Sequence, residues 1–446
     1  MRLRKWMMAV VVLLMAGAKG AAQQWTLEQC INHALEHNIQ IRQARVQQQQ
    51  GDVSLWQARG QLFPNLNFST SHSLGYRPFE QSTQMVHDGQ VTTSDNKTTY
   101  SGSYGLSTNV TLWDGGVNYK NIEAQKLQNR LTELSTEQNE LSIQEQIATL
   151  YVQILYSREA VEVNRRMEQT ARSQYERARV MQEQGQMSPA DVKQMEAQWR
   201  SAEYDIVNGE TALADYKRQL KSLLQLPMEQ DFDVAPRVPS DEQVMAPLPS
   251  KEGTLAAALQ SRPEIRSAEL GIDVADLQLD IARRGFLPTV SVGASLGDNH
   301  FSASANPYGE QLKRNLNLSA GVTVSVPIFD NRHNRAAVRK ARLGRLDSQL
   351  DLQDRRLALS STIERLWLDA NSNLQKFVAA RTQTESRQES YALLDEQFAA
   401  GLKNVVEVQE GRDQLLQAKQ NELQSKYNAL LNRQLLAFYT GQPMTL

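Results

Sequence analysis

Ala34-Leu35-Glu36-His37-Asn38 recurs in this chain as Ala258-Leu259-Gln260-Ser261-Arg262, at an offset of 224 residues (258 − 34). Leu62-Phe63-Pro64 recurs at the same offset as Phe286-Leu287-Pro288. Farther along, Leu112-Trp113-Asp114 matches Ile328-Phe329-Asp330, now at an offset of 216 residues (330 − 114). Units of about 200 residues are longer than solenoid repeats. The repetition therefore indicates two copies of one structural half, with one length difference between the proline and the aspartate of each copy.

The composition disfavours a pair of globular domains. The chain has 446 residues, of which only 40% are hydrophobic, and a mean hydropathy of −0.52. Long amphipathic helices need fewer apolar residues than globular cores, because each helix buries only a stripe. The formal net charge of −2 gives no indication of nucleic-acid binding, and none is expected.

Residues 1–22 have the pattern of a secretory signal peptide. Three basic residues precede the apolar run Met7–Ala18, and small residues follow up to Ala22, after which we expect cleavage. No later segment approaches 18 apolar residues, so we expect no transmembrane helix in the mature chain. The single cysteine, Cys30, excludes an intrachain disulfide.

Four segments alternate between apolar and small polar residues with a period of two. The apolar positions are Leu66, Phe68, Thr70, His72, Leu74 and Tyr76; Tyr100, Tyr104, Leu106, Val110 and Leu112; Val290, Val292, Ala294 and Leu296; and Leu316, Leu318, Ala320, Val322, Val324 and Val326. The opposite positions are mostly serine, threonine, asparagine and glycine. Alternation predicts strands with one apolar face.

A soluble sheet with one wet face and a membrane barrel both fit this alternation. The strand lengths, the small uncharged polar face and the aromatic residues near the strand ends favour a barrel. Four strands cannot close a barrel, since closed barrels need about eight. Because an open edge in lipid leaves backbone groups unsatisfied, the missing strands must come from other subunits. This argument does not choose between two and three copies.

Two long helices are predicted after Asp114 and Asp330, which are N-cap candidates. The runs continue to Gln184 and Ala400 without a proline and with leucine spacings typical of a coiled coil. Each run is about 70 residues, or about 100 Å. Shorter helices are expected over residues 26–62, 190–225, 254–286 and 405–439, so that two of them end to end match one long helix.

These patterns divide the chain into three parts after the signal peptide. A first structural repeat covers residues 23–227 and contains a β-hairpin at about 65–113. A proline-rich linker follows at 228–253, interpreted as an irregular segment wrapped outside the helices. The second repeat covers residues 254–446, with its β-hairpin at about 289–327. The fold class expected is a mixed α/β membrane protein with an internal duplication.

The ordered set of motifs resembles the TolC-type outer-membrane factor family, from Trp25 to Pro443. The marks are the duplicated start at Ala34 and Ala258, the strand entries ending in Pro64 and Pro288, the Val326–Arg332 run and the paired glycine turns. The resemblance implies a homotrimer in which a 12-stranded β-barrel, with four strands per subunit, is continued by a long α-helical coiled-coil periplasmic tunnel. The linker would then belong to the equatorial region of that tunnel.

The resemblance also implies a function. Family members are passive exit ducts that dock to a periplasmic adaptor and an inner-membrane pump, and we expect small-molecule export across outer-membrane lipid. No enzymatic activity and no cofactor are expected. Two alternatives remain open: an outer-membrane component of type I protein secretion, and a periplasmic coiled-coil scaffold with a soluble β-tip.

Candidate site residues follow from the same resemblance. The two glycine turns match the periplasmic tips that contact the adaptor, namely Gly185, Gln186, Met187 and Ser188, and Gly401, Leu402 and Asn404. Glu407 and Glu410 fall at the constriction of the tunnel, where mutual repulsion would raise their pKa values. Asp191, Phe398 and Lys403 align with an aperture lock. The simpler interpretation is that these are plain helix-turn-helix connections and solvated charges.

One further motif, His33-Ala34-Leu35-Glu36-His37, matches a zinc-protease signature. That signature needs a third ligand and a cleft, whereas these residues fall in an early turn of an amphipathic helix. We therefore expect an exposed histidine pair and no metal site. Nucleophile elbows, phosphate loops and dinucleotide fingerprints are not found in the sequence.

Overall fold

The structure is a computed structural model that describes residues 24–76, 78–79, 83–87, 90–94, 97–302, 304 and 306–445. The predicted signal peptide, residues 1–22, lies outside the described residues. Within these residues, none of the helices is both long enough and apolar enough to cross a lipid bilayer.

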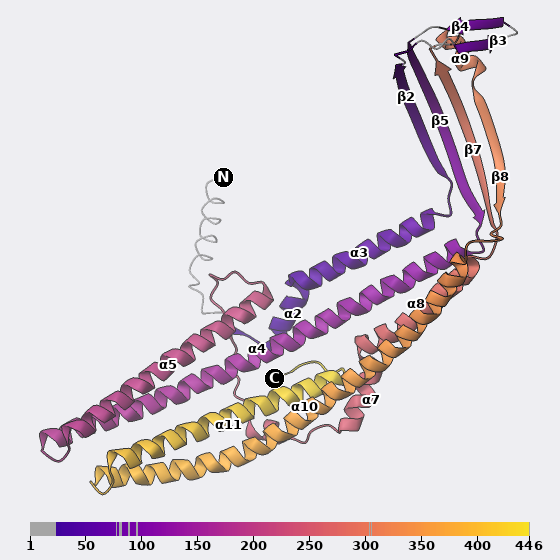
Figure 1. Cartoon of the computed structure of the whole chain (residues 1–446). Helices are drawn as coiled ribbons and strands as arrows, with labels where there is room; N and C mark the ends of the chain where they lie inside the picture. Colours follow the sequence, from indigo (N-terminus) through magenta and orange to yellow (C-terminus); the bar gives the residue numbers. More distant parts are fainter. Residues whose placement is uncertain are drawn as a thin grey trace, which may run out of the picture. The chain divides into compact units, whose positions relative to one another are not determined.

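The order of helices and strands repeats in the two halves (Figure 1). The first half contains β1 (Gln24–Trp25), α2 (Leu27–His37), α3 (Ile39–Gly60), β2 (Asn65–Tyr76), β3 (Thr83–His87), β4 (Gln90–Ser94), β5 (Thr98–Trp113), α4 (Val117–Glu183) and α5 (Pro189–Leu224). Between the halves lie β6 (Asp233–Val234) and α6 (Asp241–Met245). The second half contains α7 (Lys251–Ser261), α8 (Pro263–Arg284), β7 (Thr289–Phe301), α9 (Tyr308–Arg314), β8 (Asn317–Ser325), α10 (His333–Ala399) and α11 (Val405–Tyr439).

The long helices α4 and α10 contain 67 residues each, which confirms the expected length of about 100 Å. Both begin three residues after the predicted N-cap aspartate. Asp114 still accepts the backbone N–H of Asn118 at 2.8 Å, and Asp330 accepts that of Asn334 at 2.7 Å. The two residues between each aspartate and its helix have positive φ: Gly115, Gly116, Asn331 and Arg332. Two residues with left-handed backbone conformation therefore separate each aspartate from the first residue of its helix. The aspartate side chain still caps the helix.

The predicted single helices over 26–62 and 254–286 are each broken in two, which corrects that expectation. Asn38 leaves the helical conformation at ψ 129°, and its side chain donates to the Leu223 carbonyl at 2.9 Å. Arg262 also leaves the helical conformation, with ψ 131°, directly before Pro263. A residue before proline is restricted from the α region, which explains the second break. The repeated Asn/Arg position of the sequence motif is thus the break itself.

The linker is more regular than the sequence suggested. Its strand β6 pairs in parallel with β1, with Gln24 opposite Asp233. Farther on, Ser240 and Gln243 form a capping box at the start of α6. The expectation of a wholly irregular linker is therefore wrong. Proline and glycine content does not reveal a two-residue strand whose partner lies about 200 residues earlier in the chain.

The four long strands form one antiparallel sheet in the order β2-β5-β7-β8. Its register aligns the predicted apolar positions across all four strands. One row contains Phe68, Leu106, Leu296 and Leu318. The next row, on the opposite face, contains Asn67, Ser107, Ser295 and Ser319. The sheet therefore has one apolar and one small polar face, as the alternation predicted.

A close approach on this sheet requires glycine. Gly102 of β5 lies opposite His300 of β7, and a Cβ atom at Gly102 would lie 2.1 Å from His300 Cε1. The His300 ring covers the glycine and lies 5.2 Å from the Tyr100 ring and 5.9 Å from the Tyr104 ring. Aromatic side chains thus gather at this end of the apolar face.

The chain divides into two compact units, each described here by itself. The sheet unit contains residues 47–133 and 268–351. The helical unit contains residues up to 46, 134–267 and 352–446. The core of the helical unit is built from residues on α2, α4, α5, α10 and α11, among them Cys30, Ile147, Leu220, Ile363 and Leu436. In α4, the coiled-coil positions Leu134, Ile147, Ile154 and Val161 are buried, as their spacing predicted.

Candidate functional site at the helix-hairpin tips

Both helical hairpins end in the same type of glycine turn. At the first tip, residues 184–188, Gly185 has φ 73° and the Gln186 N–H donates to the Met181 carbonyl at 2.8 Å. At the second tip, residues 400–404, Gly401 has φ 74° and the Leu402 N–H donates to the Gln397 carbonyl at 2.9 Å. This six-to-one bond with a left-handed residue is the Schellman motif. Gly185 and Gly401 are therefore the left-handed residues that end α4 and α10.

The residue that ends each turn caps the next helix. Ser188 accepts the Asp191 N–H at 3.1 Å and donates its own hydroxyl to the Asp191 carboxylate at 2.8 Å. Asn404 accepts the Glu407 N–H at 2.9 Å, and Glu407 accepts the Asn404 N–H at 3.1 Å, which completes a capping box. Ser188 and Asn404 are therefore structural residues of the turns, whatever else they contact.

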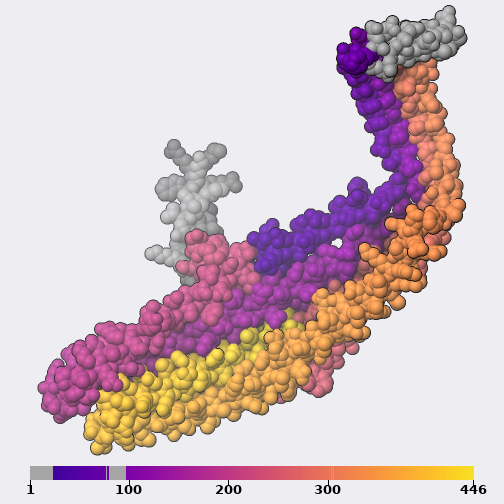
Figure 2. Space-filling view, in the orientation of Figure 1, coloured from indigo at the N-terminus to yellow at the C-terminus, as the bar shows by residue number. Residues whose placement is uncertain are grey.

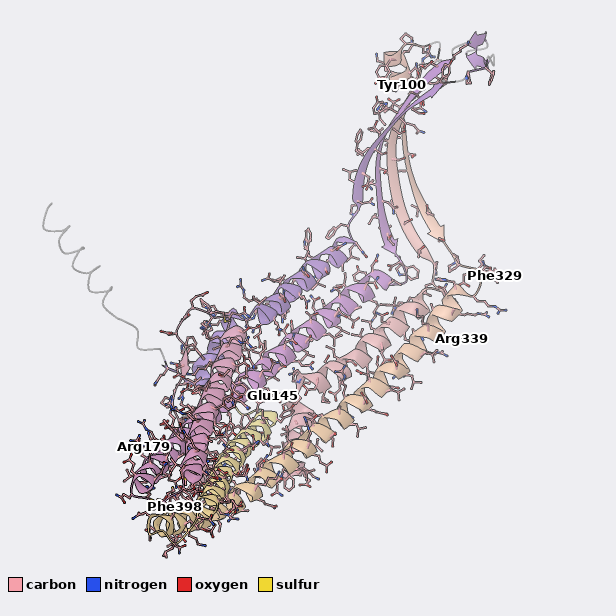
Figure 3. The ribbon with its side chains drawn as sticks, turned by 60° about the vertical axis from the view of Figure 1, so that its left-hand side comes forward. Tyr100, Glu145, Arg179, Phe329, Arg339 and Phe398 are labelled. Atoms are coloured by element: carbon pink, nitrogen blue, oxygen red, sulfur yellow. The ribbon has the colours of Figure 1, made fainter. Side chains whose placement is uncertain are left out.

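The two tips lie side by side in the helical unit (Figures 1 and 2). Side chains from all four helices fill the space between them: Ala178, Val192, Met195, Tyr391, Phe398, Val405, Val408 and Leu415, with Met187 packed against them. Phe398 is 2% exposed and lies near the end of α10 (Figure 3). It therefore acts within this apolar cluster, which we call the tip core.

A polar network next to the tip core joins α4 of the first hairpin to α10 of the second. Gln174 of α4 is buried and donates to the Tyr391 hydroxyl at 2.7 Å and to Asp395 at 2.8 Å. Arg177 donates to both carboxylate oxygens of Asp395 at 3.1 Å. Burial raises the pKa of the Tyr391 phenol to about 12, so it remains protonated at neutral pH. We call Gln174, Arg177, Tyr391 and Asp395 the tip network.

The other side of the tips is joined by α5 and α11. Gln194 donates to Gln409 at 2.8 Å, and Gln198 donates to Asp413 at 3.2 Å. Arg412, which is 5% exposed, donates to the same Asp413 carboxylate at 2.8 Å. Burial lowers the pKa of the Arg412 guanidinium. Apolar contacts and hydrogen bonds therefore both hold the hairpins together in this structure.

Within the chain, the candidate lock residues Lys403 and Asp191 have separate hydrogen-bond partners. Lys403 donates to Glu407 at 2.6 Å, whereas Asp191 is occupied with Ser188. The structure therefore brings together one lock residue and one constriction residue. The Lys403 hydrogen bond, with the Asn404 backbone N–H, lowers the pKa of Glu407. Within one chain this opposes the rise expected from carboxylate repulsion. Glu410 is exposed.

The tip surface itself is small and exposed. Gly185, Gln186 and Gly401 are exposed, and the Leu402 side chain is 75% exposed. Met187 is half-buried against the tip core. An exposed leucine at the apex of a turn is not required for the fold. Leu402 therefore does not take part in the tip core, unlike Met187.

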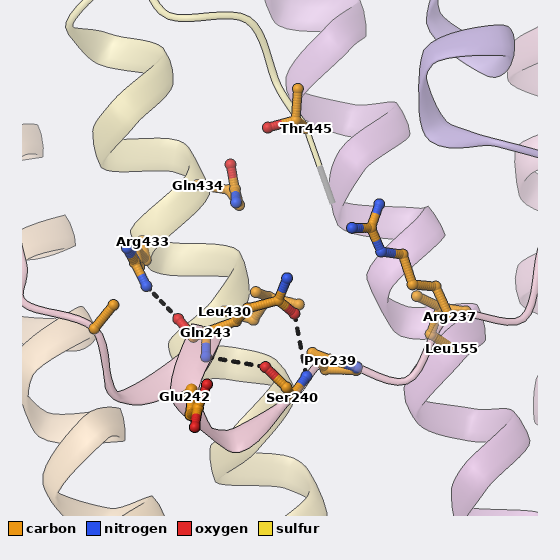
Figure 4. A pocket seen from close by; sticks show the side chains of 11 residues that line it. Leu155, Arg237, Pro239, Ser240, Glu242, Gln243, Leu430, Arg433, Gln434 and Thr445 are labelled. Atoms are coloured by element: carbon orange, nitrogen blue, oxygen red, sulfur yellow. Dashed lines mark hydrogen bonds between the residues drawn. The ribbon is translucent and has the colours of Figure 1, made fainter.

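A separate cavity of about 500 Å³ lies between the linker, α11 and the end of the chain (Figure 4). It is lined by residues that include Leu155, Arg237, Ser240, Gln243, Leu430 and Arg433. Arg433 donates to the Gln243 carbonyl and so ties the linker to α11. Within the described residues, no group of three or more His, Cys, Asp or Glu side chains is placed to bind a metal ion.

The sequence of this chain matches a known protein family. The sequence pattern described as outer membrane efflux protein matches residues 30–225 and 254–442. The chain belongs to the outer membrane efflux protein family. A curated relative is the alkaline protease secretion protein AprF of Pseudomonas aeruginosa, with 24% identity over 99% of this chain and 89% of that protein. Nodulation protein T of Rhizobium leguminosarum is 22% identical over 88% of this chain and 77% of that protein.

Solved structures confirm the fold. The outer membrane protein VceC of Vibrio cholerae has a TM-score of 0.74 at 16% identity, covering 94% of this chain and 97% of that one. The transmembrane channel protein CusC has a TM-score of 0.70 at 18% identity, covering 96% and 94%. The fold and family of this chain are those of channel proteins.

The contacts of the tip network could not be predicted from the sequence of this family member. Gln174 and Asp395 lie 221 residues apart, and an amide and a carboxylate on polar helix faces give no signal of pairing. The Lys403–Glu407 pair, in contrast, is local: Lys403 directly precedes the N-cap Asn404, and Glu407 lies four residues later in the first turn of α11. That spacing was available in the sequence and points to the local partner.

Replacing Asp395 by alanine should loosen the contact between the two hairpins. Gln174 and Arg177 would each lose an acceptor in a part-buried position, at a cost of about 1–3 kcal/mol. Hydrogen exchange of the backbone amides should become faster in α4 and α10 near the tips. Glu396→Ala, at the next and exposed position, is the matched control and should leave exchange unchanged. Equal protection in both variants would mean that the tip core alone holds the hairpins.

Proposed function

We propose that this chain is the outer-membrane exit duct of a tripartite efflux system. It would act as a passive channel that docks to a periplasmic adaptor and an inner-membrane pump and exports small molecules. Membership of the outer membrane efflux protein family supports the proposal. The duct would perform no catalysis, since the pump supplies the energy and no chemical step is needed at the channel.

The observation that carries this proposal is the apolar face of the sheet. The apolar residues of the four strands are aligned in rows on this face, and their side chains are exposed. Leu318 is 77% exposed, Phe68 is 68% exposed and Val322 is 66% exposed. A contiguous apolar surface of this kind needs a partner or lipid. The opposite face has hydroxyl pairs such as Ser295–Ser319 at 2.7 Å and Ser71–Ser103 at 2.8 Å. An apolar outer and a small polar inner face are the arrangement of a membrane barrel wall.

The sheet edges support assembly from several copies of the chain, and the number three comes from the family resemblance. In the described part of the chain, β2 pairs only with β5, and β8 pairs only with β7. Their outer edges would be left unpaired in a bilayer, which costs several kcal/mol for each unsatisfied group. If β8 of one copy pairs with β2 of the next, three copies give 12 strands from four each. That number exceeds the minimum for a closed barrel.

The helices next to these edges have apolar stripes that are also unpaired. On α3, which leads into β2, Ile39, Val46 and Val53 repeat every seven residues and are 50–62% exposed. On α10, which follows β8, Leu343, Leu350 and Leu357 repeat every seven residues and are 53–70% exposed. Heptad stripes are the seams of coiled coils. Pairing α3 of one copy with α10 of its neighbour would cover both and extend the contact between subunits.

The sheet assignment predicts opposite outcomes for adjacent substitutions. Leu318→Arg places a charge on the lipid face, at a cost of about 2–4 kcal/mol near the bilayer midplane. Ser319→Arg places the same charge on the polar face and should be mild. The measurement is the amount of heat-modifiable oligomer in outer-membrane fractions. Equal assembly of the two variants would contradict the assignment of the faces.

The tips are the proposed place of adaptor contact and of closure. Gly185, Gln186, Met187 and Ser188, with Gly401, Leu402 and Asn404, would contact the adaptor at the periplasmic end. Glu407 and Glu410 would ring the constriction, so three copies would bring six carboxylates around one axis. Asp191, Phe398 and Lys403 would contribute to the lock. Phe398 would do so through the tip core and Lys403 through its hydrogen bond to Glu407.

A constriction of this kind predicts cation block. Divalent cations on the periplasmic side should block current through the purified channel in planar bilayers. Glu407→Ala with Glu410→Ala should abolish the block. Lys403→Ala should strengthen it, because the Glu407 carboxylate loses its intrachain cation. Unchanged block in the double variant would remove these carboxylates from the constriction.

Protein secretion is the second candidate function, because the relative AprF is named an alkaline protease secretion protein and aligns over 99% of this chain. One experiment separates the two. Cells that lack this protein should accumulate a fluorescent small-molecule dye, and the wild-type chain should restore its export. Normal dye export together with loss of a protein from the culture medium would favour secretion instead.

A further inference from the structure

The histidine pair of α2 has a geometry that the channel function does not use. His33 and His37 lie on consecutive turns of α2, with ring centroids 4.2 Å apart and ring planes 12° apart. The opposite face of α2 is buried through Leu27, Cys30 and Ala34. A capping box formed by Thr26 and Gln29 holds the start of the helix. The pair is therefore presented on the outer face of a well-anchored helix, and the His37 side chain is 55% exposed.

Backbone carbonyls orient both rings. His37 Nδ1 lies 3.1 Å from the His33 carbonyl oxygen and must donate to it. The His33 ring hydrogen-bonds the backbone of Leu224, a contact that favours the protonated ring nitrogen and so has the ring as donor. In a neutral imidazole, the nitrogen that does not donate carries a free lone pair. Each ring thus has one nitrogen fixed by the backbone and one available to a ligand.

The hydrogen bonds of the two rings are of the kind that metal-binding histidines make. Metal-binding histidines donate their second ring nitrogen to a carbonyl or carboxylate, which fixes the tautomer. Two histidines at i and i+4 on one helix face are the pair that zinc-binding helices use. Burial and the neighbouring His37 lower the pKa of His33, which favours the neutral form of that ring. The Glu36 carboxylate, 4.0 Å from His37 Nδ1, adds negative charge beside the pair.

We propose that His33 and His37 chelate one divalent transition-metal ion through their free ring nitrogens, with water completing the coordination. The exposed His37 ring would rotate out of the stack and give up its hydrogen bond to the His33 carbonyl, so that one lone pair from each ring converges on the ion. Imidazole ligands suit Cu²⁺, Ni²⁺ and Zn²⁺, and the affinity order places Cu²⁺ first. The described residues provide no third protein ligand. The site therefore binds a metal without forming the hydrolytic centre that the sequence motif suggests.

The chain contains its own reporter for this site. The Trp25 ring lies edge-on to His33, with centroids 5.1 Å apart. Cu²⁺ bound at the pair would lie close enough to the indole to quench its fluorescence. Trp25→Phe should remove that part of the quenching and leave the metal affinity unchanged. The inference does not depend on what the channel exports, because the histidines are on a helix that the proposed conduction steps do not use.

The test is titration of the metal-free, assembled protein with Cu²⁺, followed by calorimetry and electron paramagnetic resonance. We expect one ion per chain and a spectrum with coupling to two imidazole nitrogens. His33→Gln and His37→Gln should each weaken binding by at least about tenfold, the loss that removing even an outer-shell partner of a ligand causes. His333→Gln, an exposed histidine at the start of α10, is the control and should bind as the parent does.

Two results would overturn the proposal. The first is unchanged Cu²⁺ affinity and stoichiometry in both pair variants, which would place the ion elsewhere. The second is a spectrum with a single coordinating nitrogen, which would reduce the site to an isolated histidine. A circular dichroism spectrum unchanged from the parent would show that a loss of binding in the pair variants is not a loss of α2.

Discussion

The need to satisfy backbone hydrogen bonds at the edges of one four-stranded sheet governs the rest of this protein. Strands β2 and β8 each have one side without a partner in the described chain, and the apolar face of their sheet is exposed, as the proposed contact with lipid requires. Water could solvate those peptide groups, but hydrocarbon cannot. Under the proposed barrel, subunit assembly would be part of the fold, and the exposed heptad stripes of α3 and α10 would extend the same requirement into the helices.

The sequence predicts features that depend on local periodicity. Alternation assigns both faces of the sheet, because the register keeps rows such as Phe68–Leu106–Leu296–Leu318 together. The glycine turns and the first residues of α5 and α11 agree with the rules for helix capping and for proline in the first turn of a helix. The helix breaks at Asn38 and Arg262 were missed because amphipathic spacing continues through them. Two hydrogen bonds of the Asn38 side chain stabilise the first break: it donates to the Leu223 carbonyl, far along the chain, and accepts the Gln40 backbone N–H at the start of α3.

The candidate site was only partly accessible to the same reasoning. The residues of the tips could be named from a family resemblance, but their partners depend on packing between two hairpins. Tyr391 and Gln174 meet across 217 residues of sequence. Lys403 and Glu407, in contrast, lie four residues apart in the sequence and are partners in the structure. Local spacing was the stronger guide there, because an i, i+4 contact costs little conformational entropy.

The equal lengths of α4 and α10 limit how this chain can change in evolution. Both have 67 residues, and both join the sheet at one end to a tip at the other. Deleting one residue from α10 alone would shorten it by about 1.5 Å and rotate everything beyond by about 100°. Asp395 would then leave the face that meets Arg177. Insertions and deletions should therefore survive only as whole heptads, matched in both long helices and in the shorter helices beside them. Such a protein can therefore become longer only when insertions of the same length occur in all of its parallel helices.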